Sequence, residues 1–365
     1  MAERGQRVIT YAEAIREAFV QSMERDERII IIGEGVPDPN AIFGTTRGLQ
    51  KRFGAERVLD MPLAENGMTG ICIGAALGGL RPVLIHQRID FALLSMDQIV
   101  NNAAKWRYMF NDQGSVPLVI RMLIGRGWGQ GPQHAQSLHA LFAHIPGLKV
   151  VMPATPSDAK GMMIAAIEDD DPVLFIEHRW LHGIRDHVPE QYGSVSLDRA
   201  VTLRQSKMVS EMCVTIAAFS HTVVDAVMAA DILEQCGVAV TIIDMRSARP
   251  IDLEPVLASV KETGHLVVLD TGWASCGVSA EVVARSVERG FSMLKKAPVR
   301  ITPPDHPIPT SHYLTTDCYP GAKAIVSAVF DLIDPRKTID NINIVRDFLS
   351  DGPKDVPYKT FTGPF

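Results

Sequence analysis

Met61-Pro62-Leu63-Ala64-Glu65-Asn66-Gly67-Met68-Thr69-Gly70, continued through 71–80 and followed by Arg81-Pro82-Val83-Leu84-Ile85-His86, is the stretch that decides the fold. A proline ends an apolar run, one carboxylate opens a helix of small residues, and an apolar strand follows. Glu65 carries the only charge in 62–80, so we expect this helix to be almost wholly buried. With the apolar run at 28–32 before it, the stretch forms a βαβ unit.

The same alternation extends along the chain. Apolar strands are predicted at 28–32, 82–86, 116–120, 148–152 and 172–176, with helices at 11–25, 65–79, 94–109 and 156–169. Such unbroken apolar runs are typical of parallel strands covered on both faces. A second block has predicted strands at 213–217, 238–243 and 265–269, and helices near 222–235, 252–261 and 277–290. We therefore expect an α/β protein of two doubly wound domains, separated by a polar linker over 191–209.

Composition excludes several classes of protein. The chain has 365 residues, 46% of them hydrophobic and 21% charged, which suits two packed domains and excludes a disordered chain. A net charge of −6 argues against a nucleic-acid-binding surface. No apolar run reaches the roughly 18 residues of a membrane span. The first seven residues lack the hydrophobic core of a signal peptide, so we expect a cytoplasmic protein.

The five cysteines are scattered and form no CxxC pair, so we expect reduced core thiols rather than disulfides or a zinc site. The glycine-rich segment Gly125-Arg126-Gly127-Trp128-Gly129-Gln130-Gly131 does not match GxGxxG, and no Walker loop, GxSxG elbow or HExxH pair occurs. The segment follows a predicted strand, at the edge where open α/β sheets bind ligands.

Three single residues have both a structural and a functional explanation. Glu65 either satisfies amides in the first turn of its helix or is an acid held in a low-dielectric cleft to exchange a proton with a bound heterocycle. His134, just after the glycine-rich segment, and Phe91, just past a strand end, are on local pattern alone more often ordinary packed residues.

Their order and spacing carry more information than any one of them. The motifs are Gly33-Glu34, Pro62-Leu63-Ala64-Glu65 with the glycine-rich helix, Gly79-Leu80-Arg81-Pro82, Asp97-Gln98-Ile99-Val100-Asn101, Gln133-His134, His144-Ile145-Pro146-Gly147-Leu148-Lys149-Val150-Val151, Pro153 with Ser157-Asp158-Ala159-Lys160-Gly161, Met245-Arg246 with Arg249-Pro250-Ile251-Asp252, and Gly272-Trp273. Together they resemble the β subunit of the thiamine-diphosphate-dependent decarboxylating component of 2-oxo acid dehydrogenase complexes, a branch of the transketolase-like enzymes.

The resemblance implies a domain plan and site residues. Residues 1–190 would form the pyrimidine-binding domain, 210–338 the transketolase C-terminal domain, and 339–365 an extension that most relatives lack. Glu65 falls on the glutamate that activates the cofactor by sharing a proton with a pyrimidine nitrogen. Phe91, Gln87 and Glu34 fall in the pyrimidine pocket, and His134 on the histidine that faces the substrate. A structural potassium site implied by the resemblance maps to the backbone carbonyls of Leu118, Ala166, Asp169 and Asp171.

An absent motif points to a partner. Transketolase-like enzymes hold the diphosphate and its Mg²⁺ through GDG, and this chain contains no GDG. The resemblance therefore implies an α subunit that supplies this half of the site, most simply in an α₂β₂ assembly. The expected reaction is decarboxylation of a 2-oxo acid such as pyruvate, followed by acyl transfer.

The acyl acceptor stays open at this stage. The first candidate is the lipoyl group of an acyltransferase, and the second is an aldehyde, a ketone or a sugar, as in a transketolase or an acyloin synthase. A non-catalytic regulatory partner is a third hypothesis, which intact Glu65 and His134 disfavour. His86 and Arg88 replace a more apolar or acidic stretch of many relatives, which suggests a polar or anionic substrate. The extension 339–365 occupies the end of the chain that relatives use for docking the acyltransferase, so it bears on the same choice.

Overall fold

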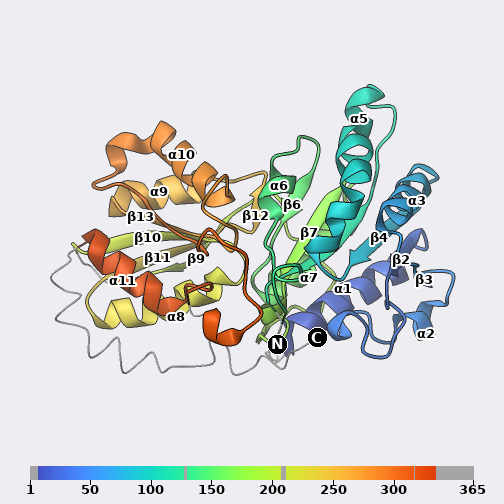
Figure 1. Ribbon diagram of the computed structural model, residues 1–365, viewed down its shortest axis with the longest axis horizontal. Helices are drawn as coiled ribbons and strands as arrows, with labels where there is room; N and C mark the ends of the chain where they lie inside the picture. The colour runs from blue at the N-terminus through green and yellow to red at the C-terminus, as the bar shows by residue number, and fades with distance from the viewer. Residues whose placement is uncertain (1–6, 127–129, 207–210, 316, 334–365) are drawn as a thin grey trace, which may run out of the picture. The chain divides into compact units, whose positions relative to one another are not determined.

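A computed structural model describes residues 7–126, 130–206, 211–315 and 317–333 of the chain. The predicted extension 339–365 therefore lies outside the described residues. Within them the chain divides into two compact units (Figure 1). Unit 1 comprises the residues up to Gly125 together with Leu141–Leu197, and unit 2 comprises Arg126–Ala140 and the residues from Asp198 onward.

Unit 1 is built on a parallel sheet with the strand order β6-β7-β5-β4-β2-β3. A separate antiparallel pair joins β1 and β8. Because all strands of the main sheet run in one direction, their carboxyl ends lie at one edge, where α/β proteins bind ligands. The strands are β1 (Val8–Thr10), β2 (Ile29–Gly33), β3 (Val58–Leu59), β4 (Arg81–His86), β5 (Val119–Ile124), β6 (Lys149–Val151), β7 (Val173–His178) and β8 (Arg185–His187).

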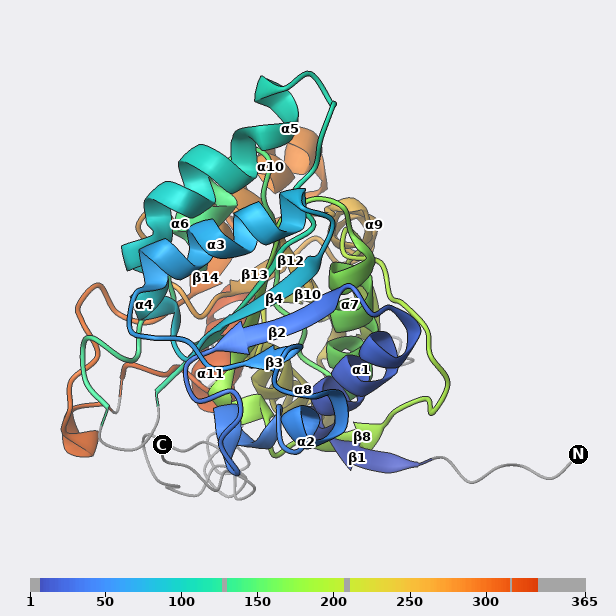
Figure 2. The same cartoon turned by 90° about the vertical axis from the view of Figure 1, so that its right-hand side faces the viewer.

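Helices cover both faces of this sheet, as a doubly wound fold requires (Figure 2). α1 and α7 pack against each other, while α3 packs on β4. Local sequence signals fix the helix starts: Thr10 and Glu13 form a capping box for α1, and Thr155 caps α7 just before Pro156. The helices are α1 (Tyr11–Arg25), α2 (Leu49–Phe53), α3 (Glu65–Leu77), α4 (Ile89–Ala92), α5 (Trp106–Met109), α6 (His139–Ala143) and α7 (Pro156–Glu168).

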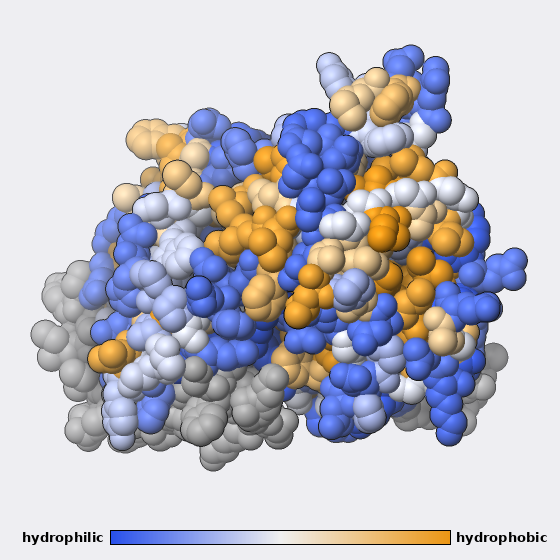
Figure 3. Space-filling model, turned by 45° about the vertical axis from the view of Figure 1, so that its right-hand side comes forward, coloured by the Kyte–Doolittle hydropathy of each residue, from blue (hydrophilic) through white to orange (hydrophobic). Residues whose placement is uncertain are grey.

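Helix α3 is less buried than its sequence suggested. Within the chain, Ile71 is 59% exposed and Leu77 39% exposed, whereas Met68, Cys72 and Ala76 are buried. Leu63, just before the helix, and Leu94, in the turn η2 (Leu93–Ser95) that contacts α3, are 82% and 62% exposed. The expectation of an almost wholly buried helix is therefore wrong for the single chain. Figure 3 shows such hydrophobic side chains reaching the surface.

Unit 2 has a five-stranded sheet with the order β14-β13-β10-β11-β9, parallel except for the edge strand β9. Helices α8 and α11 pack together, as do α9 and α10. The strand β9 falls inside the segment predicted as a linker. The elements are β9 (Val201–Gln205), β10 (Cys213–Ala218), β11 (Ala239–Asp244), β12 (Ser247–Arg249), β13 (Leu266–Leu269), β14 (Val299–Ile301), α8 (Thr222–Gln235), α9 (Glu254–Thr263), α10 (Val278–Gly290) and α11 (Ala322–Ile333).

The predicted α/β fold is thus confirmed, with two local differences. The strand expected at 116–120 begins at Val119, because Pro117 has no amide hydrogen for the ladder. The helix expected over 94–109 is a succession of short 3₁₀, π and α segments. Among the described residues, no helix is long and apolar enough to cross a membrane.

Candidate active site

Three carboxylates gather at the carboxyl edge of the unit 1 sheet. Glu34 follows β2, Asp60 follows β3, and Glu65 is the first residue of α3. The Asp60 carboxylate accepts hydrogen bonds from the amides of Gly35 and Met61, both at 2.9 Å. Burial, and then the negative charges of Glu65 and Asp60, raise the pKa of Glu34. The three groups therefore lie close enough to influence one another electrostatically.

Glu65 is buried, with 8% of its surface exposed. Ala64, which precedes it, provides no side-chain cap for α3. Among the described residues, no hydrogen bond or ion pair to the Glu65 carboxylate is found, so Glu65 caps no backbone amide, although it is the acidic residue in the first turn of α3 and complements the helix dipole there. Its carboxylate oxygens are not among the fully buried atoms that lack a hydrogen-bond partner, so they remain accessible to a ligand. Glu65 is therefore well suited to a proton-sharing contact with a ligand or a partner.

The backbone brings Glu34 beside Gln87. Gln87 follows β4 and donates from Nε2 to the carbonyl of Glu34 at 3.1 Å. A side chain at Gly33 would place its Cβ 2.5 Å from the carbonyl oxygen of Ile85, so only glycine allows β2 and β4 this approach. The structure thus brings Glu34, Glu65 and Gln87 to one edge. Phe91 lies half-buried in α4, the next element after Gln87.

His134 belongs to unit 2, where it is half-buried in a turn and its amide donates to the carbonyl of Gly131 at 3.2 Å. The same segment is anchored by His139, whose Nε2 lies 2.9 Å from the carboxylate of Asp270. Asp270 follows β13 and also accepts from the amides of Gly272 and Ser279, both at 2.9 Å. Both side chains of the pair are fully buried. Sequence reasoning missed this pair, although Asp270 lies only two residues before the Gly272-Trp273 motif.

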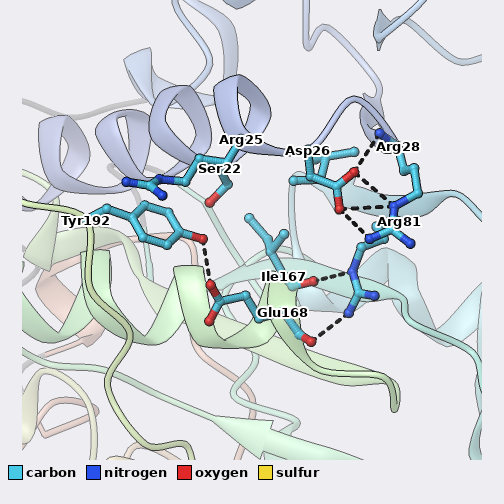
Figure 4. Close-up of a pocket in the computed structure, with 9 residues that line it drawn as sticks. Ser22, Arg25, Asp26, Arg28, Arg81, Ile167, Glu168 and Tyr192 are labelled. Atoms are coloured by element: carbon cyan, nitrogen blue, oxygen red, sulfur yellow. Dashed lines mark hydrogen bonds and ion pairs between the residues drawn. The ribbon is translucent and has the colours of Figure 1, made fainter.

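Three of the four predicted potassium ligands, Ala166, Asp169 and Asp171, fall near the end of α7, and the fourth, Leu118, lies just before β5. At the end of α7, Arg81 donates to the carbonyls of Ile167 at 2.8 Å and Glu168 at 2.7 Å, beside a pocket of about 330 Å³ (Figure 4). Arg81 also donates to the carbonyl of Asp169 at 2.7 Å, and the carbonyl of Leu118 accepts from the Val173 amide at 3.0 Å. Two of the four predicted carbonyls therefore already have protein donors. The potassium site stays a prediction.

Among the described residues, no group of three or more His, Cys, Asp or Glu side chains could hold a metal ion.

A buried ionic network, also missed by sequence reasoning, lies in the same sheet. Arg121 of β5 and Glu177 of β7 are fully buried and paired, with Nη2 donating to Oε2 at 2.8 Å. His182 Nε2 contacts the same oxygen at 2.8 Å. Burial lowers the pKa of His182 to about 4, so its ring is neutral at pH 7 and donates from Nε2. This network neutralises one buried guanidinium of unit 1.

Comparison with known proteins accounts for this architecture. The transketolase pyrimidine-binding domain matches residues 7–183, and the transketolase C-terminal domain matches residues 206–325. The β subunit of acetoin:2,6-dichlorophenolindophenol oxidoreductase from Bacillus subtilis (strain 168) is 36% identical over 90% of this chain and 98% of its own length. The mitochondrial pyruvate dehydrogenase E1 component subunit beta of Bos taurus is 36% identical over 88% of this chain and 89% of its own. The chain belongs to the transketolase-like E1 β-subunit family.

This membership confirms the family that the sequence motifs suggested. A further E1 β-type relative, the acetoin:2,6-dichlorophenolindophenol oxidoreductase β subunit of Cupriavidus necator, is 40% identical over 86% of this chain and 94% of that protein. A solved structure described as a split-gene transketolase, an inactive β4 tetramer, matches 89% of this chain and 98% of its own with a TM-score of 0.69 and 22% identity. At that identity the likeness concerns the fold alone.

Proposed function

We propose that this E1 β subunit is one half of a thiamine-diphosphate-dependent enzyme that decarboxylates a 2-oxo acid, such as pyruvate, and transfers the acyl unit to a lipoyl acceptor. The observation that carries the proposal is Glu65, a buried carboxylate without a partner among the described residues, at the ligand-binding edge of the sheet. The names of the relatives, pyruvate dehydrogenase and acetoin oxidoreductase β subunits, support the same reaction class.

The residues at this edge fit the pyrimidine of thiamine diphosphate. When bound, this cofactor supplies the carbon nucleophile that attacks the keto carbon. Glu65 would share a proton with a pyrimidine nitrogen, in a setting where burial strengthens the hydrogen bond. Gln87 and Glu34 would line the pocket, Phe91 would pack on the ring, and His134 would face the substrate.

An α subunit would complete the site. The chain has no GDG motif for the diphosphate and its Mg²⁺, so we assign that half to a partner, most simply in an α₂β₂ enzyme. The exposed apolar residues on and beside α3, Leu63, Ile71 and Leu94, support a partner surface there, because isolated soluble chains rarely leave such a patch in water. The structural potassium and a cytoplasmic location remain predictions.

A second candidate keeps the cofactor and changes the acceptor. Direct transfer of a two-carbon unit to an aldehyde, a ketone or a sugar is favoured by the names of the acetoin oxidoreductase β subunits, because acetoin is an acyloin. A lipoyl acyltransferase is therefore a proposed partner only for the first candidate.

The decisive experiment compares the chain alone with the chain assembled on its α subunit. We expect calorimetry to show no tight, Mg²⁺-dependent binding of thiamine diphosphate by the isolated chain, and no decarboxylation of 2-oxo acids. Both should appear on assembly. Micromolar, Mg²⁺-dependent binding by the isolated chain would contradict the shared site, and an assembled enzyme that decarboxylates no 2-oxo acid would contradict the function.

A further inference from the structure

The segment 130–140, which carries His134, belongs to unit 2. Gly125, before it, and Leu141, after it, both belong to unit 1. Within the segment the amide of His134 donates to the carbonyl of Gly131 at 3.2 Å. A functional side chain on such a connecting segment needs a rigid scaffold to position it. The placement of His134 therefore depends on the contacts that the segment makes with the rest of unit 2.

Contacts with one loop of unit 2 hold the first half of the segment. Arg126, which is fully buried, donates from Nη2 to the carbonyl of Thr310. Gly131 lies so close to the side chain of Thr310 that a larger residue at this position would collide with it. Ala135 lies with Ile308 in a small buried apolar cluster. The residues on both sides of His134 are therefore attached to the same loop.

A buried polar contact holds the end of the segment. His139, the first residue of α6, places Nε2 at 2.9 Å from Oδ1 of Asp270, and both side chains are fully buried. The other ring nitrogen of His139, Nδ1, has no hydrogen-bond partner among the described residues. A side chain at Gly272 would place its Cβ 2.9 Å from Cε1 of His139 and 3.4 Å from the carbonyl oxygen of Ser137. Glycine therefore allows the segment to approach this closely.

Asp270 is itself fixed by the backbone of unit 2. Its Oδ1 accepts from the amide of Gly272 and its Oδ2 from the amide of Ser279 in α10, both at 2.9 Å. Burial alone would raise the pKa of Asp270, but His139 and the two amides outweigh burial and hold this pKa below its usual range. The carboxylate is therefore ionised at pH 7 and can only accept, so Nε2 of His139 is the donor. Hydrogen bonds to a charged group are among the strongest in proteins, so this pair is a firm anchor five residues after His134.

We propose that His139 and Asp270 are positioning residues for His134: the buried pair holds the segment 130–140 in the conformation in which His134 faces the substrate. This inference rests on the proposed function, because it concerns the histidine that the proposed reaction uses. A displacement of about 1 Å at a reacting group can reduce a rate about a hundredfold, even when the substitution lies away from the chemistry. Loss of the pair should therefore impair the steps that need His134. Activation of the cofactor by Glu65, in unit 1, should stay intact.

The first experiment measures amide hydrogen exchange in the full-length chain and requires neither the α subunit nor turnover. In His139→Ala the amides of 130–140 should exchange at least about tenfold faster, because the segment has lost a hydrogen bond to a charged group. His139→Gln keeps a side-chain N–H donor and should restore most of the protection. The control is His265→Ala, which removes another buried histidine of unit 2, one whose Nδ1 lies 3.0 Å from the carbonyl oxygen of Cys213. The control should leave exchange in 130–140 unchanged.

The second experiment uses the enzyme assembled with its α subunit. His139→Ala should lower kcat by about tenfold to a hundredfold, while deuterium exchange at the thiazolium carbon stays at the native rate. A merely structural role would lower both rates together. In a chain that already carries His134→Ala, His139→Ala should reduce kcat no further, because a residue that acts only through His134 has nothing left to position. Asp270→Asn weakens the same contact and should show the same pattern, which keeps the test valid if His139→Ala is too unstable.

Each experiment has an outcome that contradicts the proposal. Unchanged exchange of 130–140 in His139→Ala, or equal increases in His139→Ala and His265→Ala, would overturn the anchor. Additive losses of kcat in the His134→Ala chain, or thiazolium exchange that slows together with kcat, would overturn the positioning role. An assembled native enzyme that decarboxylates no 2-oxo acid would contradict the proposed function instead, and amide exchange would still decide whether the pair anchors the segment.

Discussion

Replacing Glu177 by glutamine should strongly destabilise unit 1. The amide keeps the shape of the side chain but leaves the fully buried Arg121 without its counter-charge. It also changes the oxygen that His182 Nε2 contacts at 2.8 Å. Removing one partner of a buried ion pair is costly because the remaining charge can be neither solvated nor compensated.

The pKa of Glu177 gives the size of the expected loss in the free energy of unfolding. Burial alone would raise this pKa, but the charge and hydrogen bonds of Arg121, with a hydrogen bond from His182, outweigh burial and lower it from 4.5 to about 2. The difference corresponds to roughly 3 kcal/mol of preference for the ionised form. We therefore expect Glu177→Gln to lower the free energy of unfolding by about 3–5 kcal/mol at pH 7.

The same pKa of Glu177 predicts how its contribution to stability changes with pH. The folded pKa lies below the ordinary one, so the stabilisation by Glu177 is complete above pH 4.5 and is lost as the pH falls towards 2. The difference in the free energy of unfolding between the native chain and Glu177→Gln should therefore become smaller as the pH falls over that range.

Urea unfolding combined with hydrogen exchange of the β5 and β7 amides would measure this loss, because exchange separates unit 1 from unit 2. The control is Glu254→Gln, which makes the same chemical change at a side chain that is 67% exposed and paired with Arg289. Exposed ion pairs contribute about 0–1 kcal/mol, so the control should change little. A loss below about 1 kcal/mol in Glu177→Gln would refute the reasoning.

Three further predictions concern other sites. Ile71→Glu, on the exposed face of α3, should leave the stability of the isolated chain within about 0.5 kcal/mol but prevent assembly with the α subunit in size-exclusion chromatography, and normal assembly would contradict it. Asp270→Asn should cost about 1–3 kcal/mol in urea unfolding, since His139 and two amides lose a charged acceptor; an unchanged midpoint would oppose this. Glu34→Gln should raise the thermal midpoint at pH 7, because burial and Glu65 raise the folded pKa of Glu34; the gain should vanish below pH 4.5, and a lower midpoint at pH 7 would argue against it.

The regular elements could be predicted because each depends on a local pattern. Unbroken apolar runs near 28–32 and 82–86 became β2 (Ile29–Gly33) and β4 (Arg81–His86). The capping residue Thr10 begins α1 where the periodicity indicates. The family resemblance was equally accessible, because its motifs are short and ordered along the chain.

The remaining features depend on information that one sequence does not contain. Arg121 and Glu177 are 56 residues apart, and His139 and Asp270 are 131 apart, so each pair depends on the tertiary fold rather than on a local pattern. The exposure of Ile71 was mispredicted because small apolar residues look alike whether they face the core of their own chain or a partner.

The most direct test of the central claim is deuterium exchange at the thiazolium carbon of thiamine diphosphate bound to the assembled enzyme. Glu65→Gln keeps the size of the side chain but cannot share a proton in the same way, so we expect exchange and turnover to slow together by a similar, large factor. Glu56→Gln, at an exposed position of unit 1, should exchange at the native rate. Exchange at the native rate in Glu65→Gln would contradict the assignment of Glu65 as the activating acid.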